Sequence, residues 1–196
     1  MDFNTILDTL KVGVGLVYLY LEYKARPSMW AASIVMPIIG MILFYNKGLY
    51  ADAAINVYYL LIAVYGFYKW TRGATHHEGR PQPITHVAPL TAAILAAVWA
   101  AVWCTIWWVL VSFTDSTVPV LDSFTTSMSI VGMWMLARKY IEQWIVWLVV
   151  DAVYVYLYYK KAVYFSGTLY GFYTVMAIAG YLKWRQMMSQ DQSRLS

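Results

Sequence analysis

The segment from Gln143 to Tyr159, QWIVWLVVDAVYVYLYY, constrains this chain more than any other. It is an apolar run long enough to cross most of a lipid bilayer, yet it carries an acid in its interior. On a helix, residues spaced by three and four form one stripe, here aromatic rings around a single carboxylate: Trp144, Trp147, Asp151, Tyr154 and Tyr158. An ionisable residue inside a membrane span is a functional-site hypothesis by default.

The whole chain has the composition of a membrane protein. Of its 196 residues, 61% are hydrophobic and only 12% are charged, which leaves too little polar surface for a soluble domain. Windowed hydropathy predicts seven transmembrane helices, at residues 4–23, 29–45, 53–70, 88–113, 118–136, 141–159 and 166–184. The segment 71–87 is polar and contains two prolines, so it is predicted to be an exposed loop. The single cysteine, Cys104, falls inside an apolar helix and is interpreted as a small packing residue.

The basic residues predict the orientation in the membrane. Ten of the fourteen fall on one side of the predicted spans: Lys24, Arg26, Lys69, Arg72, Arg80, Arg138, Lys139, Lys183, Arg185 and Arg194. The positive-inside rule then places the C-terminus in the cytoplasm and, with seven spans, the N-terminus outside. These charges are dispersed over short loops, so no nucleic-acid partner is predicted.

An internal repeat appears when the chain is slid against itself by 114 residues, so that Trp30–Trp70 matches Trp144–Trp184 without a gap. The identical pairs include Trp30/Trp144, Tyr59/Tyr173, Gly66/Gly180 and Trp70/Trp184. A unit of three helices can be duplicated in one orientation only if an extra helix lies between the copies. The sequence therefore predicts a 3 + 1 + 3 order of parallel halves. The expected divisions are residues 1–70, 71–117 and 118–196, with any substrate site near the membrane midplane.

Several polar and aromatic groups have a structural interpretation. Trp70 and Trp184 stand at cytoplasmic helix ends beside lysines and are interpreted as interfacial anchors. The hydroxyls in the span 118–136 are interpreted chiefly as aids to close helix packing: Ser123, Thr125, Thr126, Ser127 and Ser129. His76, His77 and His86 lack the spacing of a metal site, so neither a metal nor another cofactor is predicted.

Asp151 is the strongest functional signal, because no Lys or Arg is placed at its depth to pair with it. Such an acid must be protonated, solvated or neutralised by a cationic ligand. Trp147, one turn earlier, offers a face for a cation–π contact. The two residues predict a pocket for a small, flat, positively charged molecule. Further candidates for contact with the substrate are Asn56, Tyr154 and Tyr173, with Trp144 as a supporting wall.

Other classes of membrane protein fit less well. A light-driven pump needs a buried lysine for a retinal Schiff base, and no lysine falls in the middle of a predicted helix. An intramembrane enzyme needs a nucleophile with a base or a metal set at one depth, and no histidine lies inside a span. A receptor would not explain Asp151 and the duplicated halves. A transporter, and not an enzyme, is therefore predicted.

The segment ARKYIEQWIVWLVVD resembles the PnuC family of bacterial vitamin transporters, whose helix 6 carries Trp-x-x-Trp-x-x-x-Asn, or Asp in some members. Trp144, Trp147 and Asp151 occupy the three signature positions, and NVYYLLIAVYGFYKW in the first half is also similar. The resemblance implies seven helices in 3 + 1 + 3 order, similar to a full-length version of the SWEET sugar transporters. It also implies a homotrimer in the bacterial cytoplasmic membrane.

The function implied by this resemblance is facilitated diffusion of a vitamin precursor by alternating access. Nicotinamide riboside is the leading substrate and thiamine the alternative, because both are flat permanent cations that suit Trp147 and Asp151. Riboflavin, which is neutral and larger, ranks third. The departure from the usual pattern is Asp151, where the nicotinamide riboside signature most often has Asn.

Overall fold

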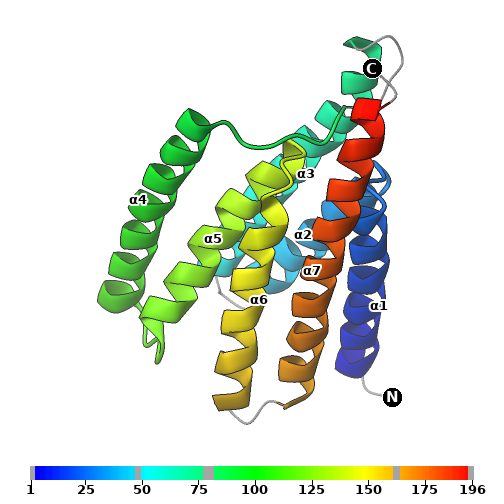
Figure 1. The fold of residues 1–196 in the computed structure, drawn as a ribbon. Helices are drawn as coiled ribbons and strands as arrows, with labels where there is room; N and C mark the ends of the chain where they lie inside the picture. The colour runs from blue at the N-terminus through cyan, green and yellow to red at the C-terminus, as the bar shows by residue number, and fades with distance from the viewer. Residues whose placement is uncertain (1–2, 47–49, 77–81, 161–163, 194–196) are drawn as a thin grey trace. The chain divides into compact units, whose positions relative to one another are not determined.

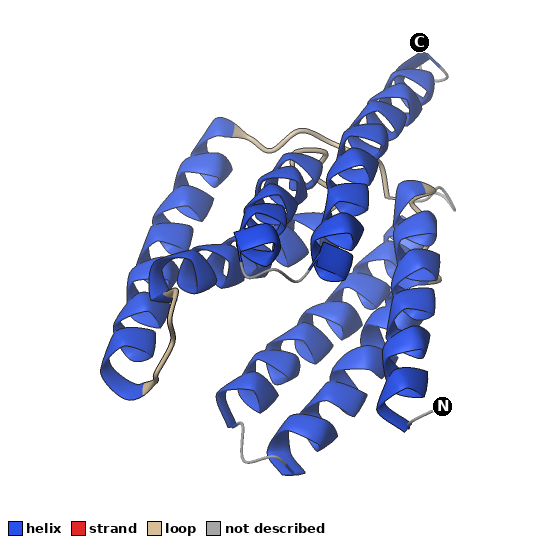
Figure 2. Ribbon diagram, turned by 90° about the horizontal axis from the view of Figure 1, so that it is seen from below, coloured by secondary structure: helices blue, strands red, loops and turns tan. Residues whose placement is uncertain are grey.

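A computed structural model describes residues 3–46, 50–76, 82–160 and 164–193 of the chain. Within these residues the chain forms seven helices joined by loops (Figures 1 and 2). They are α1 (Phe3–Tyr23), α2 (Met29–Asn46), α3 (Tyr50–His76), α4 (Pro89–Phe113), α5 (Pro119–Ala137), α6 (Gln143–Lys160) and α7 (Tyr164–Ser193). The predicted all-α class and the seven helices are confirmed.

Two helices run further than hydropathy indicated. α3 continues to His76, so the predicted loop beginning at Thr71 is wrong for its first turn and a half. The Thr71 hydroxyl donates a hydrogen bond of 2.7 Å to the Phe67 carbonyl, and no proline intervenes before Pro81. α7 likewise extends through the polar segment that follows Trp184. Hydropathy marks the apolar part of a helix, whereas the helix itself ends where its backbone hydrogen bonding ends.

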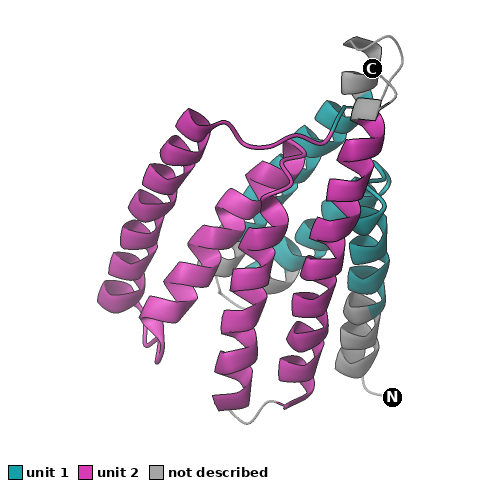
Figure 3. Ribbon diagram, viewed as in Figure 1, with its two compact units in different colours: residues 1–83 teal, residues 84–196 magenta. Residues whose placement is uncertain are grey.

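The chain divides into two compact units, residues 1–83 and residues 84–196 (Figure 3). In the first unit, α2 contacts both α1 and α3. In the second, contacts between the described helices run in chain order, from α4 to α5, α6 and α7. α6, which carries Asp151, therefore lies between α5 and α7, as α2 lies between α1 and α3.

The turn that precedes the central helix has the same backbone in both units. Ala25 and Lys139, 114 residues apart, are the non-glycine residues with positive φ in the described chain, at 51° and 56°. Around each, two N–H groups close the end of the preceding helix in a Schellman motif. Ala25 N–H bonds Glu22 O at 2.8 Å as Lys139 N–H bonds Leu136 O at 2.9 Å, and Arg26 and Tyr140 make the matching outer bonds. The repeat register thus extends beyond Trp30 into the preceding turn.

Each unit also contains a clasp of two tryptophans and a glycine: Trp30, Gly66 and Trp70 in the first, and Trp144, Gly180 and Trp184 in the second. The two rings meet edge to face, with centroids 5.6 Å apart in the first unit and 5.7 Å in the second. A Cβ on either glycine would overlap the ring of Trp30 or Trp144. All four tryptophans are at most 1% exposed. The predicted anchoring role of Trp70 and Trp184 is therefore wrong, because their rings fill the interior of a unit.

Four of the five α5 hydroxyl groups are buried, which agrees with the packing role predicted for them, and Thr126 is half-buried. Ser123, Thr125, Ser127 and Ser129 are all buried, and each hydroxyl donates to a backbone carbonyl three or four residues earlier. Short side chains bonded in this way let neighbouring helices approach closely.

α4 is the most apolar helix and has no buried residue. By length and mean hydropathy, two of the described helices suffice to cross a membrane, α4 at 2.2 and α5 at 1.2. The surface of α4 includes Trp107, Trp108 and Phe113, which suits a nonpolar environment better than water. Cys104 is exposed on this helix, so its predicted packing role within the chain is wrong.

Candidate functional site

Asp151 lies near the middle of α6 and is 8% exposed. Within the described residues no cationic side chain forms an ion pair with it. Its electrostatic neighbours include three tyrosines, Tyr154 on α6 and Tyr170 and Tyr173 on α7. The carboxyl group therefore lies near three aromatic rings that carry hydroxyl groups.

These tyrosines and Tyr158 form a continuous tyrosine cluster, defined by Tyr154, Tyr158, Tyr170 and Tyr173. The Tyr170 ring is central, with centroids 4.7 Å from Tyr154, 5.3 Å from Tyr158 and 5.6 Å from Tyr173. The Tyr158 and Tyr170 planes are nearly parallel, at 25°, whereas Tyr170 and Tyr173 meet edge to face at 75°. Offset and edge-to-face rings stabilise such a cluster and fix the direction of each hydroxyl.

Trp147 packs against a glycine on the neighbouring helix. A Cβ placed on Gly132 of α5 would lie 3.5 Å from the Trp147 ring and 3.0 Å from Val146 Cγ1. The indole Nε1 of Trp147 is shielded from solvent and has no hydrogen-bond partner among the described residues. Gly132 thus sets the position of the ring, and the ring retains an unused donor.

Tyr154 is held from α5 as well. Its hydroxyl interacts with the Thr125 hydroxyl, and Thr125 is fully buried. Thr125 in turn donates to the Leu121 carbonyl at 3.0 Å, which fixes its rotamer. α5 therefore supports two side chains of the α6 stripe, Trp147 through Gly132 and Tyr154 through Thr125.

The predicted substrate-binding residues occupy three places. Trp147, Asp151, Tyr154 and Tyr173 belong to the neighbourhood just described. Trp144 is fully buried in the clasp, one turn before Trp147. Asn56 belongs to the first unit, where its side chain packs against Gly40 of α2.

Sequence reasoning did not identify Gly132 as a support for Trp147 or Thr125 as a support for Tyr154. A signal for Gly132 exists in the repeat. The register of 114 pairs Ser33 with Trp147 and Tyr18 with Gly132, so the small and the aromatic residue exchange helices between the units. In the first unit Tyr18 makes a side-chain hydrogen bond with Ser33. No comparable signal marks Thr125, because its partner in the register, Lys11, has unrelated chemistry.

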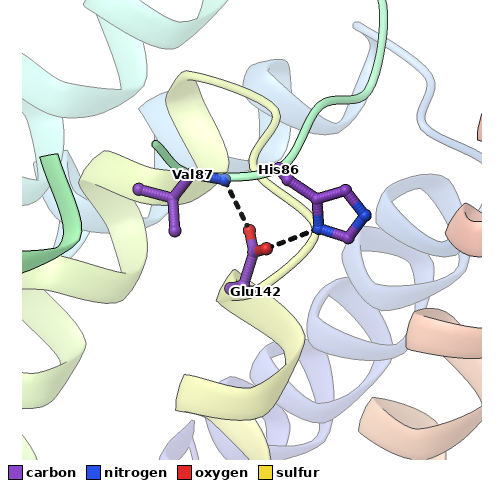
Figure 4. Close-up of polar contacts among 3 residues, drawn as sticks. All are labelled: His86, Val87 and Glu142. Atoms are coloured by element: carbon purple, nitrogen blue, oxygen red, sulfur yellow. Dashed lines mark hydrogen bonds and ion pairs between the residues drawn. The ribbon is translucent and has the colours of Figure 1, made fainter. Parts of the chain in front are cut away.

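The histidines are placed as follows. His86 Nδ1 lies 2.7 Å from Glu142 Oε1, and the His86 side chain is 60% exposed (Figure 4). His76 ends α3, and His77 lies outside the described residues. No group of three or more metal-ligating side chains occurs in the part of the chain that the structure describes.

Comparison with known proteins decides the family. The chain matches the sequence profile of a family described as nicotinamide mononucleotide transporter over residues 5–186. The chain belongs to this family. The predicted PnuC family is thereby confirmed, and membership of a transporter family agrees with the prediction that the chain is not an enzyme.

Two similar proteins are transporters of different vitamins. The nicotinamide riboside transporter PnuC of Escherichia coli K12 is 22% identical over 203 residues, covering 92% of this chain and 85% of that protein. The riboflavin/roseoflavin transporter RibM of Streptomyces davaonensis is 24% identical over 172 residues, covering 87% of this chain and 80% of that protein. A crystal structure of the vitamin B3 transporter PnuC has the same fold, with a TM-score of 0.68 at 20% identity over 91% of this chain and 80% of that one. This chain therefore belongs to a family of transporters, and these relatives carry vitamins or vitamin precursors.

Proposed function

We propose that this protein takes up a small cationic vitamin or vitamin precursor, nicotinamide riboside in the first place and thiamine as the alternative. The observation that carries the proposal is Asp151, a buried carboxyl group with three tyrosines among its electrostatic neighbours and no cationic partner among the described residues. Trp147 lies one turn earlier on the same helix. A buried carboxylate without a counter-charge is costly, and a bound cation offsets that cost. A permanent cation does so without having to gain a proton.

The rings near Asp151 suit the shape of such a ligand. A cation within about 6 Å of an aromatic centroid is attracted by the ring quadrupole. A flat pyridinium or thiazolium can use the face of Trp147 or of a tyrosine, and the unused indole N–H of Trp147 can donate to a ligand oxygen. The tyrosine hydroxyls can bind ribose hydroxyls or an amino-pyrimidine. The proposed substrate-binding set is Trp147, Asp151, Tyr154, Tyr173, Asn56 and Trp144.

Riboflavin is the third candidate, because RibM of Streptomyces davaonensis transports it. Riboflavin has no positive charge to offset Asp151, which is why the cationic vitamins rank above it. An intramembrane enzyme or a receptor is the remaining alternative and has no residue set to support it.

We place the protein in the bacterial cytoplasmic membrane, with seven spans, the N-terminus outside and the C-terminus inside, as the basic residues indicate. The 3 + 1 + 3 order, with divisions at 1–70, 71–117 and 118–196, is supported by the two equal turns and the two equal clasps. Transport is then facilitated diffusion by alternating access, in which movement of the two halves opens the site first to one side of the membrane and then to the other. A homotrimer with one pore per chain follows from the PnuC resemblance.

Calorimetric titration of the purified protein with nicotinamide riboside, thiamine and riboflavin tests the proposal. We expect saturable binding of one cationic vitamin and weaker or no binding of riboflavin. Trp147→Ala should weaken that binding, whereas Trp108→Ala, on the exposed surface of α4, should not. Binding of riboflavin alone would contradict the proposal.

Pro37, which aligns with Asp151 in the repeat, lies inside α2, where it removes one backbone hydrogen bond, and it is the proposed hinge of the first half. Pro37→Ala should slow uptake into proteoliposomes while leaving vitamin binding in place. An unchanged uptake rate would remove the hinge from the mechanism.

A further inference from the structure

The five residues before α4, residues 84–88, are bonded to the turn between α5 and α6. We call this segment the strap. Thr85 pairs with the α5–α6 turn through two backbone hydrogen bonds, Thr85 N–H to Lys139 O at 3.2 Å and Ile141 N–H to Thr85 O at 3.0 Å. Glu142 accepts two more, from Val87 N–H at 3.1 Å and, at 2.7 Å, from the His86 ring (Figure 4). Ile84 is buried, with 6% of its surface exposed. The strap thus joins the start of α4 to the start of α6.

A second attachment holds α4 further along its length. The Trp103 indole N–H donates to Ser123 Oγ at 3.1 Å on α5. Trp99 and Trp103 stack at 5.2 Å, and both meet Phe124 of α5 edge to face at 5.7 and 5.6 Å. At 1.5 Å per residue, the strap and Trp103 are about 20 Å apart along α4. Two attachments so far apart restrict both sliding and rotation of α4 against α5.

The equivalent turn of the first unit cannot receive the strap. Its backbone is the same, but the register of 114 places Pro27 where the second unit has Ile141 and Ser28 where it has Glu142. Proline has no N–H to donate to the Thr85 carbonyl. Serine has no carboxylate to accept from both Val87 and His86. The two turns thus share a backbone conformation but differ in the two residues that bind the strap.

We propose that the linking helix α4 is mechanically part of the second unit, so that it moves with α5, α6 and α7 while α1, α2 and α3 form the other moving body. The inference rests on the proposed alternating-access function. It assigns Ile141 N–H and Glu142 as the groups that decide which half the linking helix follows. During transport, a body of four helices then moves against a body of three helices.

Cross-linking α4 to α5 tests the motion. Cys104 of α4 and Val120 of α5 line the same apolar hollow, and the sequence contains a single cysteine. In a Val120→Cys variant, a short bifunctional thiol reagent should join the two helices without slowing vitamin uptake into proteoliposomes. The same variant with Cys104→Ser is the control for labelling alone. A cross-link that abolishes uptake while vitamin binding persists, or that fails to form, would overturn the proposal.

Glu142→Ser, which installs the residue of the first unit, tests the recognition. We expect amide hydrogen exchange of residues 84–88 to become about tenfold faster, as loss of a charge-assisted hydrogen bond implies, and uptake to fall while vitamin binding is kept. Asp115→Asn, in the exposed α4–α5 turn, is the matched control. Unchanged exchange would contradict the role of Glu142. If the wild-type protein bound no vitamin, the proposed function would fail, and the exchange experiment would still test the strap.

Discussion

The clasp of the first unit and the clasp of the second are nearly the same, whereas the residues beside them have changed. Each clasp sets one tryptophan edge to face on another over a glycine, at 5.6 and 5.7 Å. Beside the second clasp α6 carries Trp147, Asp151 and Tyr154, and at the same places α2 carries Ser33, Pro37 and Gly40. The tryptophan–glycine packing is the same in both units, whereas the carboxyl group and the additional aromatic side chains occur only on α6.

The difference fits the proposal that one copy of a duplicated unit gained a binding site while both copies kept the fold. Gly40 and Asn56 pack together in the first unit, and at the equivalent positions of the second the rings of Tyr154 and Tyr170 meet at a tilt of 41°, with centroids 4.7 Å apart. The aromatic ring beside the clasp belongs to Tyr18 of α1 in one unit and to Trp147 of α6 in the other. A ring in either place fills the interior, so the functional residues could change while the space between helices stayed filled.

The largest effect is expected from the glycines of the clasps. Gly66→Ala and Gly180→Ala should each destabilise the protein by about 3 kcal/mol, because the added Cβ overlaps a buried tryptophan ring that has no room to shift. Thermal unfolding of the detergent-purified variants measures the loss. Gly171→Ala in α7, where a Cβ meets nothing within 4 Å, is the control and should stabilise slightly. A large loss at one clasp and none at the other would show that the clasps are not equivalent.

A smaller effect is expected at Gly132, which supports the α6 stripe. The added Cβ of Gly132→Ala would crowd Val146 at 3.0 Å and press on the Trp147 ring at 3.5 Å. Stability should fall by about 1 kcal/mol. Vitamin affinity in calorimetric titration should fall several-fold, since the ring that we propose to face the cation is displaced. Full affinity in this variant would mean that the position of Trp147 is not critical for binding.

The smallest effect concerns the turns. Burial lowers the pKa of Lys139 from 10.5 to about 8, and Asp191 on α7 opposes that shift. The unfolded chain then binds more protons than the folded chain above pH 8, so stability should rise by about 1 kcal/mol between pH 7 and pH 9. Lys139→Ala installs the residue that Ala25 supplies in the first unit and should remove this rise. Parallel pH dependence of the wild type and the variant in thermal unfolding would contradict the assignment.

Much of the fold was predictable because it depends on patterns that the sequence carries directly. Long apolar runs gave the seven helices, and identities such as Gly66/Gly180 gave the repeat. The roles of Trp70 and Trp184 were not predictable, because a tryptophan beside a lysine at a helix end has the same pattern whether it faces lipid or the interior. The strap could not be predicted from the sequence either, because backbone hydrogen bonds between Thr85 and the α5–α6 turn leave no side-chain pattern.

The candidate site was predictable where it lies on one helix. The spacing of Trp147, Asp151 and Tyr154 fixes their common face on α6. Contacts between helices, such as Gly132 with Trp147 or Tyr158 with Tyr170, depend on how α5 and α7 approach α6. No periodicity within a single segment encodes that approach.

We propose above that Asp151, the carboxyl group of the second unit, recognises a positive charge. Calorimetric titration of Asp151→Asn with thiamine and with nicotinamide riboside tests this claim most directly, with Asp115→Asn as the control. An amide can still donate and accept hydrogen bonds but offers no counter-charge. We expect thiamine affinity to fall about tenfold or more and nicotinamide riboside affinity to fall less, because the nicotinamide riboside signature that this helix resembles most often has Asn at this position. Equal losses for both vitamins, or no loss for either, would contradict the claim.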